Sequence, residues 1–139
     1  MGVLRRFGVS MDEILLEKFD ALINEKGYQN RSEAIRDIVR EQLVSEEWKS
    51  EKGEKVGTVT LVYNHHKRGL SDELNHIQHE MGKFIISTMH IHLDHDNCLE
   101  MIIVKGEAKK VKQLVDRLIG LKGVKHGRFV MTTTGKEIV

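Results

Sequence analysis

Hydrophobic and polar residues alternate at the start of the chain, over residues 3–10. Phe7 and Val9 fall on the apolar side of this pattern, and the other side carries Arg6, Gly8 and Ser10. Alternation with a period of two predicts a short β-strand with one apolar face.

Two helical patterns follow the strand. Apolar residues recur at helical spacing over residues 11–26, and Gly27 suits the left-handed conformation that often ends a helix. The second pattern covers residues 30–48 and begins at Asn30 with a sequence similar to a capping box. We therefore expect two helices joined by a short turn.

The rest of the chain alternates strand and helix patterns. Residues 49–57 are charged and contain glycines, which indicates a linker between a domain of residues 1–48 and a domain of residues 58–139. The expected elements are strand 57–64, helix 71–81, strand 83–93, strand 98–104, helix 107–121 and strand 124–132. The order βαββαβ is that of a ferredoxin-like (ACT-like) domain, so the predicted fold class is α+β.

The N-terminal strand and its two helices are too short to bury a sufficient core alone. A lone strand also leaves both of its edges unpaired. Pairing with the same strand of a second chain solves both problems and predicts a dimeric ribbon-helix-helix domain. Ribbons of this kind contact base edges in the major groove of double-stranded DNA.

Four residues are candidates for DNA contacts in such a ribbon. Arg6 can donate to guanine, Ser10 can donate or accept, and Gly8 allows close approach of the backbone. Arg31, at the start of the second helix, can bind a phosphate. Residues 1–48 carry 7 Lys and Arg against 10 Asp and Glu, so the prediction depends on placement rather than on net charge. The alternative is a solvated dimer edge that binds no DNA.

Composition narrows the class of protein. The 139 residues have a formal net charge of +1, which gives no general nucleic-acid signature. No run of about 18 apolar residues is present, so we expect no membrane span. The single cysteine excludes an intramolecular disulfide and fits a reducing cytoplasm. Of the 8 histidines, all except His126 lie between His65 and His95, which points to metal chemistry.

A candidate metal site lies around strand 83–93. His90 and His92 are two residues apart, so their imidazoles share one face of the strand. The apolar odd-numbered positions are expected to face the helices of the domain, which leaves the histidines on the opposite face. A three-residue turn at residues 94–96 would place Cys98 directly across from His92 on that face.

His79 would complete a four-coordinate set of donors. It lies on helix 71–81, which should cover the apolar face, so it should not reach His90 and His92 of its own chain. A ligand at this position must come from another subunit, and the site would then join two chains. Three nitrogens and a thiolate suit Zn, Cu or Ni, and four protein donors leave no open position for catalysis, so we expect no enzyme. The alternative without a metal is a set of polar interface histidines with a buried cysteine.

Several segments carry a resemblance to a known family. They are GYQNRSEAIRDIVR (27–40), VYNHHKRGL (62–70), HIHLDHDNCLEMIIVKG (90–106), GVKHG (123–127) and the spacing H-x₁₀-H-x-H-x₅-C from His79 to Cys98. Over nearly the whole chain, these motifs resemble those of NikR-type nickel-responsive transcriptional regulators. The resemblance implies a homotetramer in which two ribbon-helix-helix dimers flank a core of four regulatory domains.

The resemblance also implies roles for single residues. It implies one Ni(II) per chain in a square-planar site whose ligands are His90, His92 and Cys98 of one chain and His79 of another. It implies base-contacting positions at Arg6, Gly8 and Ser10. Members of the family commonly carry a hydroxyl residue at the position of Gly8, so the resemblance does not extend to the operator sequence.

Further residues match positions of interest in the family. Glu33 and Asp37 match carboxylates that in relatives contribute to a second, weaker cation site, although solvated helix carboxylates beside arginines are the alternative. His65 matches a position near the metal and could bind a second cation at high metal load. His76 could hydrogen-bond to a ligand, and Glu100 should share the metal face and could orient a ligand.

The sequence thus predicts a cytoplasmic, nickel-responsive repressor. Metal binding at the tetramer core would promote binding to a palindromic operator in double-stranded DNA, and the expected targets are genes of nickel uptake. The alternative is a regulator of the same scaffold that responds to another metal (Cu, Co or Zn) or to a small-molecule effector.

Overall fold

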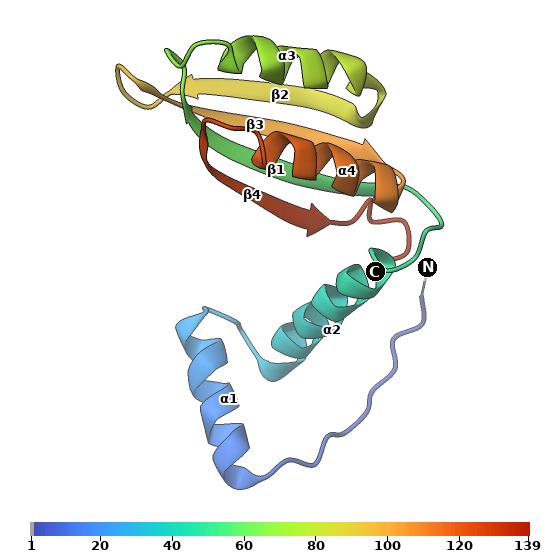
Figure 1. Cartoon of the computed structure of the whole chain (residues 1–139). Helices are drawn as coiled ribbons and strands as arrows, with labels where there is room; N and C mark the ends of the chain where they lie inside the picture. The colour runs from blue at the N-terminus through green and yellow to red at the C-terminus, as the bar shows by residue number, and fades with distance from the viewer. Residues whose placement is uncertain (1) are drawn as a thin grey trace. The chain divides into compact units, whose positions relative to one another are not determined.

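The computed structural model describes residues 2–139 and divides the chain into two compact units, of which the first ends at Arg40 and the second begins at Glu41. Figure 1 shows the elements in chain order. They are α1 (Glu13–Glu25), α2 (Arg31–Glu47), β1 (Lys55–Asn64), α3 (Leu70–Glu80), the 3₁₀ turn η1 (Gly82–Phe84), β2 (Ile85–His92), β3 (Asn97–Gly106), α4 (Ala108–Ile119) and β4 (Val124–Thr132).

Local side-chain contacts set the ends of α1 and α2. Asp12 caps α1, where its Oδ1 accepts the N–H groups of Ile14 at 2.9 Å and Leu15 at 3.4 Å. Gly27, with a φ of 81°, turns the chain after α1. Asn30 Oδ1 accepts the Glu33 N–H at 2.9 Å at the start of α2. Both helices predicted from the sequence are therefore confirmed.

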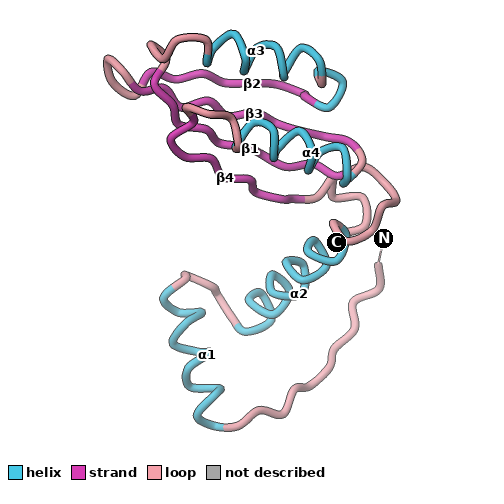
Figure 2. The backbone as a smooth tube through the Cα atoms, in the orientation of Figure 1, coloured by secondary structure: helices cyan, strands magenta, loops and turns pink. Residues whose placement is uncertain are grey.

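The strand predicted over residues 3–10 is not formed in the single chain. These residues lie in the loop that precedes α1 (Figure 2). Phe7 is 77% exposed and Val9 is 58% exposed. The hydrogen bonds of a β-strand need a neighbouring strand, and this segment pairs with none among residues 2–139. Exposed apolar side chains on an unpaired segment are what a ribbon requires before it meets its partner.

The second unit has the βαββαβ order predicted from the sequence. Its four strands form an antiparallel sheet in the order β2-β3-β1-β4. Both α3 and α4 lie over the same face of this sheet (Figure 1). The core lies between the sheet and these helices, and its fully buried side chains include Val59, Leu61, Leu74, Ile102, Val104, Leu114 and Leu118.

The end of α2 packs with the second unit. Trp48 is 2% exposed, and its ring contacts the edge of Phe129 at a centroid distance of 5.4 Å. Its Nε1 donates to the Thr132 carbonyl oxygen at 2.8 Å. These contacts explain why the boundary between the two compact units falls within α2, after Arg40. The sequence placed the end of the first domain later, at residue 48, and that domain boundary stays a prediction.

The pairing of β2 with β3 corrects the expected faces of β2. Cys98 and Glu100 on β3 are buried beneath the helices, and His92 and His90 pair with them in register. Paired residues share a face, so both histidines lie on the helix-covered side of the sheet, and the sequence-based expectation was wrong. The apolar residues Met89, Ile91 and Leu93 point to the opposite face and are 45–53% exposed. Alternation predicts two faces of a strand, but it does not tell which face the helices cover.

Candidate metal centre

The candidate metal centre lies where β2 and β3 are joined, close to the end of β1. Leu93 N–H donates to the Asn97 carbonyl oxygen at 2.8 Å and closes the turn around residues 94–96. This three-residue turn places Cys98 opposite His92, as the sequence predicted.

Asp94 holds the turn in its conformation. Its Oδ1 accepts the N–H groups of Asp96 at 2.9 Å and Asn97 at 2.8 Å. The Asn97 side-chain amide also donates to this carboxylate. The Asn97 side chain, followed by the two backbone donors, lowers the pKa of Asp94 to about 2. The turn is therefore defined by fixed hydrogen bonds rather than by solvent.

Cys98 is buried at the centre of the donor group. Its Sγ lies 3.3 Å from Nδ1 of His92 and 3.1 Å from Nδ1 of His65. Burial raises the pKa of the Cys98 thiol, and the nearby charges of Glu100 and Asp94 raise it further. A thiol has a single proton, so it can donate to one of the two imidazoles only. A metal ion in place of that proton would contact all three donors.

His65 is the third member of the donor group, at a position for which the sequence predicted only a second cation at high metal load. It follows β1, whose Asn64 pairs with Asn97 on β3, and its N–H donates to the Asp96 carbonyl oxygen at 3.1 Å. Partial burial lowers the pKa of His65, and the charges of neighbouring histidines lower it further. The signal was available, because the ferredoxin-like order places β1 beside β3.

His90 lies next to this group without joining it. Its ring stacks on that of His92 at a centroid distance of 5.2 Å and is tilted against Tyr63 at 6.0 Å. Among residues 2–139, the donor atoms of His65, His92 and Cys98 all lie within 4.8 Å of one another. The structure thus brings together two of the predicted ligands, with His90 beside them.

A buried carboxylate connects the centre to α3. Glu100 is opposite His90 and 8% exposed. It accepts the Tyr63 hydroxyl at 3.0 Å and the Gln78 amide at 3.1 Å. Burial raises the pKa of Tyr63, and the charge of Glu100 raises it further. This network joins α3 to β1 and β3. The expected role of Glu100 in orienting a metal ligand stays a prediction.

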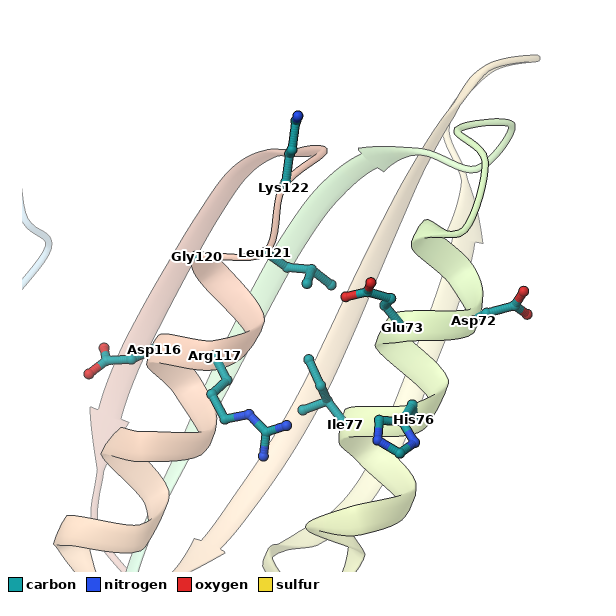
Figure 3. Close-up of a pocket in the computed structure, with 9 residues that line it drawn as sticks. All are labelled: Asp72, Glu73, His76, Ile77, Asp116, Arg117, Gly120, Leu121 and Lys122. Atoms are coloured by element: carbon teal, nitrogen blue, oxygen red, sulfur yellow. The ribbon is translucent and has the colours of Figure 1, made fainter.

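The two histidines of α3 are not members of the donor group gathered within residues 2–139. His79 follows Gln78 and is exposed. His76 lines a groove between α3 and α4, together with Asp116 and Arg117 (Figure 3). Its Nε2 lies 3.8 Å from Glu80, which also accepts from Arg117 at 3.0 Å. His79 is not one of the three donors gathered within residues 2–139, and its role as a ligand from another subunit stays a prediction. The reason expected from the sequence, an opposite sheet face, was wrong, because His90 and His92 lie on the side that the helices cover.

The predicted DNA-contacting residues lie in the first unit. Arg6, Ser10 and Arg31 line one groove between the N-terminal segment and the helices. Arg31 makes a bidentate hydrogen bond to Asp20: its Nε donates to Oδ1 at 2.8 Å and its Nη2 to Oδ2 at 2.7 Å. This contact lowers the pKa of Asp20. A phosphate would have to share Arg31 with Asp20. Gly8 is exposed in the same segment.

The two carboxylates of the expected second cation site form ion pairs with arginines. Glu33 is paired with Arg36. Asp37 is paired with Arg40 at 2.9 Å and also accepts the Tyr28 hydroxyl at 2.9 Å, which is the main cause of the lowered pKa of Asp37. A cation at this site would compete with these arginines.

Comparisons with known proteins match both parts of the chain to family models. Residues 56–132 match the family model described as NikR C terminal nickel binding domain, and residues 5–46 match the model described as ribbon-helix-helix protein, copG family. In the part of the chain that the structure describes, no helix is long and apolar enough to cross a membrane.

Full-length relatives extend the match over the whole chain. Proteins named "Putative nickel-responsive regulator" are 60% identical in Geotalea uraniireducens and 59% identical in Geobacter sulfurreducens, each over 99% of both chains. The Pyrococcus furiosus protein of the same name is 55% identical over 100% of both chains. An uncharacterized protein, TM1266 from Thermotoga maritima, has a TM-score of 0.52 at 13% identity, over 58% of this chain and 100% of its own. This last likeness concerns the fold alone.

A ribbon-helix-helix segment followed by a metal-binding α+β domain defines a class of metal-responsive transcriptional regulators. Within that class, the chain belongs to the NikR family of nickel-responsive regulators. The family consists of DNA-binding regulators, so the prediction that this chain is not an enzyme is confirmed.

Proposed function

We propose that this chain is a nickel-dependent repressor in which metal binding by the second unit promotes operator binding by the first. The observation that carries the proposal is the register of β2 and β3, which places His92 opposite Cys98 and His90 opposite Glu100 on one face. Three ligands of one ion can therefore come from His90, His92 and Cys98. The names of the relatives support nickel as the metal. We propose one Ni(II) per chain.

The fourth ligand in this proposal is His79 of the partner subunit. His79 is exposed on α3, so it is accessible to a neighbouring chain. The bound ion would supply a cross-link between subunits. Met89, Ile91 and Leu93, exposed on the sheet face opposite α3 and α4, support an assembly of chains, which we propose to be a homotetramer.

The DNA-binding step rests on the first unit. We propose that two chains pair their residues 3–10 into a ribbon that contacts bases through Arg6, Gly8 and Ser10, with Arg31 at a phosphate. Two such dimers suit a palindromic operator. The proposed targets are genes of nickel uptake, and the proposed location is the cytoplasm.

Glu33 and Asp37 are proposed to bind a second cation once the arginines beside them are displaced.

Operator binding titrated with nickel tests this function. Wild-type protein and the Cys98→Ala variant are compared with His126→Ala, which removes an exposed histidine on β4. We expect nickel to promote operator binding by wild type and by His126→Ala, and to have no such effect on Cys98→Ala, whose circular dichroism should match wild type. Nickel-dependent binding by Cys98→Ala would contradict the proposal.

One observation favours a different metal as a second candidate. Within a single chain the structure gathers His65, His92 and Cys98, a donor set that also suits tetrahedral Zn²⁺. The absorption spectrum separates the two candidates, because four-coordinate planar Ni(II) has d–d bands and Zn²⁺ has none. Promotion of operator binding by zinc and not by nickel would establish the zinc regulator.

A further inference from the structure

A second group of donor atoms lies beside the metal centre. His66, His95 and Asp96 are all exposed, and their ligand atoms lie within 4.8 Å of one another. Nε2 of His66 is 3.8 Å from Oδ1 of Asp96. The rings of His66 and His95 are 5.2 Å apart between centroids. No ligand of the proposed nickel site is a member of this group.

Backbone contacts bring these side chains together. His66 N–H donates to Oδ1 of Asn64 at 2.8 Å, which shapes the chain after β1. His65 N–H donates to the Asp96 carbonyl oxygen at 3.1 Å, and His66 Nε2 lies 3.0 Å from the His95 carbonyl oxygen. The end of β1 is thus joined directly to the turn between β2 and β3. Because Asp94 fixes that turn, the three donors are held by the fold and not only by their own rotamers.

We propose that His66, His95 and Asp96 form a surface site for a borderline divalent cation such as Zn²⁺. Two imidazole nitrogens and a carboxylate oxygen are suitable donors, and water would fill the remaining position. Metal–ligand distances of about 2.1 Å imply about 3.4 Å between donors around a tetrahedral ion, so a small closure of the His66–Asp96 pair suffices. The ion would replace the contact of His66 Nε2 with the His95 carbonyl oxygen, and the ring proton of His66 would then be on Nδ1.

This site differs from the nickel site in two testable respects. It contains no thiolate, so its occupancy does not depend on Cys98. All of its donors come from one chain, so its occupancy does not depend on His79 of the partner subunit. Metal binding at the surface site and at the nickel site can therefore be tested independently.

Equilibrium dialysis of the full-length protein against Zn²⁺, with bound metal counted by mass spectrometry, tests the proposal. The variants are His66→Gln, His95→Gln and Asp96→Asn. His126→Gln is the matched control, since it also removes an exposed histidine of the same unit. Cys98→Ala provides the second comparison. Trp48 fluorescence verifies that each variant keeps the core of the unit.

We expect each of the first three variants to bind one zinc ion fewer per chain than wild type, and His126→Gln to bind as wild type does. Cys98→Ala should retain the ion that His66→Gln loses. The nickel–thiolate absorption of His66→Gln should equal that of wild type, which keeps this test separate from the test of nickel binding. Wild-type zinc content in His66→Gln and His95→Gln, or loss of the same ion in Cys98→Ala, would overturn the surface site.

Discussion

At the scale of single residues, Glu100 connects the candidate metal centre to α3. Its carboxylate is buried opposite His90 and accepts hydrogen bonds from Tyr63 on β1 and Gln78 on α3. When a buried acceptor loses its donor, it has no water to bond to instead, and the folded state is destabilised. The network therefore stabilises the unit and fixes the position of α3, which carries His79.

Tyr63→Phe tests the energetic weight of this network. Loss of the hydroxyl donor should lower the free energy of unfolding by about 1.5 kcal/mol or more, the range for hydrogen bonds to charged groups. Urea unfolding followed by Trp48 fluorescence reports on the core of the second unit. Tyr28→Phe is the control, because its hydroxyl bonds to Asp37 at an exposed position in the first unit. Equal shifts of the Trp48 transition in both variants would argue against the network.

Arg6→Ala tests base contact by the N-terminal segment. Loss of a bidentate contact to guanine should weaken operator binding by about 1–3 kcal/mol, measured by fluorescence anisotropy at fixed salt concentration. Nickel affinity should not change, since Arg6 belongs to the first unit and the metal donors to the second. Lys112→Ala, on the exposed side of α4, is the control for a simple loss of positive charge. An unchanged operator affinity of Arg6→Ala would contradict the ribbon.

At the scale of elements, the turn between β2 and β3 determines whether His92 and Cys98, two of the proposed metal ligands, lie on the same face. An odd number of turn residues keeps Cys98 on the face of His92, and one residue fewer would move the thiol to the other face. Asp94 determines this geometry, because it accepts from two backbone N–H groups of the turn. In the proposed nickel site the turn would therefore contribute to metal binding, although none of its own residues is a proposed ligand.

Replacement of Asp94 tests this role of the turn. In Asp94→Ala the N–H groups of Asp96 and Asn97 lose their acceptor, so their hydrogen exchange should accelerate by about tenfold or more, and stability should fall by about 1 kcal/mol. Asp94→Asn is the matched control, because its side-chain carbonyl can still accept both bonds. Exchange rates measured by NMR should then follow the order wild type, Asn, Ala. Slow exchange of both amides in Asp94→Ala would show that another group holds the turn.

At the scale of the whole molecule, exposed apolar surface supports the proposal that several chains assemble. Met89, Ile91 and Leu93 lie on the sheet face opposite α3 and α4, and Phe7 and Val9 are exposed in the N-terminal segment. Both surfaces are expected in a protein that pairs through its ribbons and again through its sheets. The proposed fourth nickel ligand, His79 of the partner subunit, also requires contact between the second units of two chains.

Ile91→Glu tests assembly through the sheet face. A charge placed at a buried interface without a partner is costly, so we expect the tetramer to dissociate into ribbon-linked dimers, measured by sedimentation velocity. High-affinity nickel binding should weaken with it, since each site loses its fourth ligand. Lys112→Glu, at an exposed position of α4, should leave the tetramer intact. A tetrameric Ile91→Glu variant would show that the chains meet elsewhere.

The sequence by itself determined the helices, the βαββαβ order and the three-residue turn that aligns His92 with Cys98, because these features depend on local periodicity and turn length. Two features required the tertiary structure. Period-two alternation divides the residues of β2 between two faces, but it does not tell which face the helices cover. The faces expected from the sequence were therefore the reverse of those in the structure. His65 reaches Cys98 only because β1 pairs with β3, a contact between residues 33 positions apart in the chain. Long-range pairing, unlike periodicity, is settled only when the whole sheet has formed.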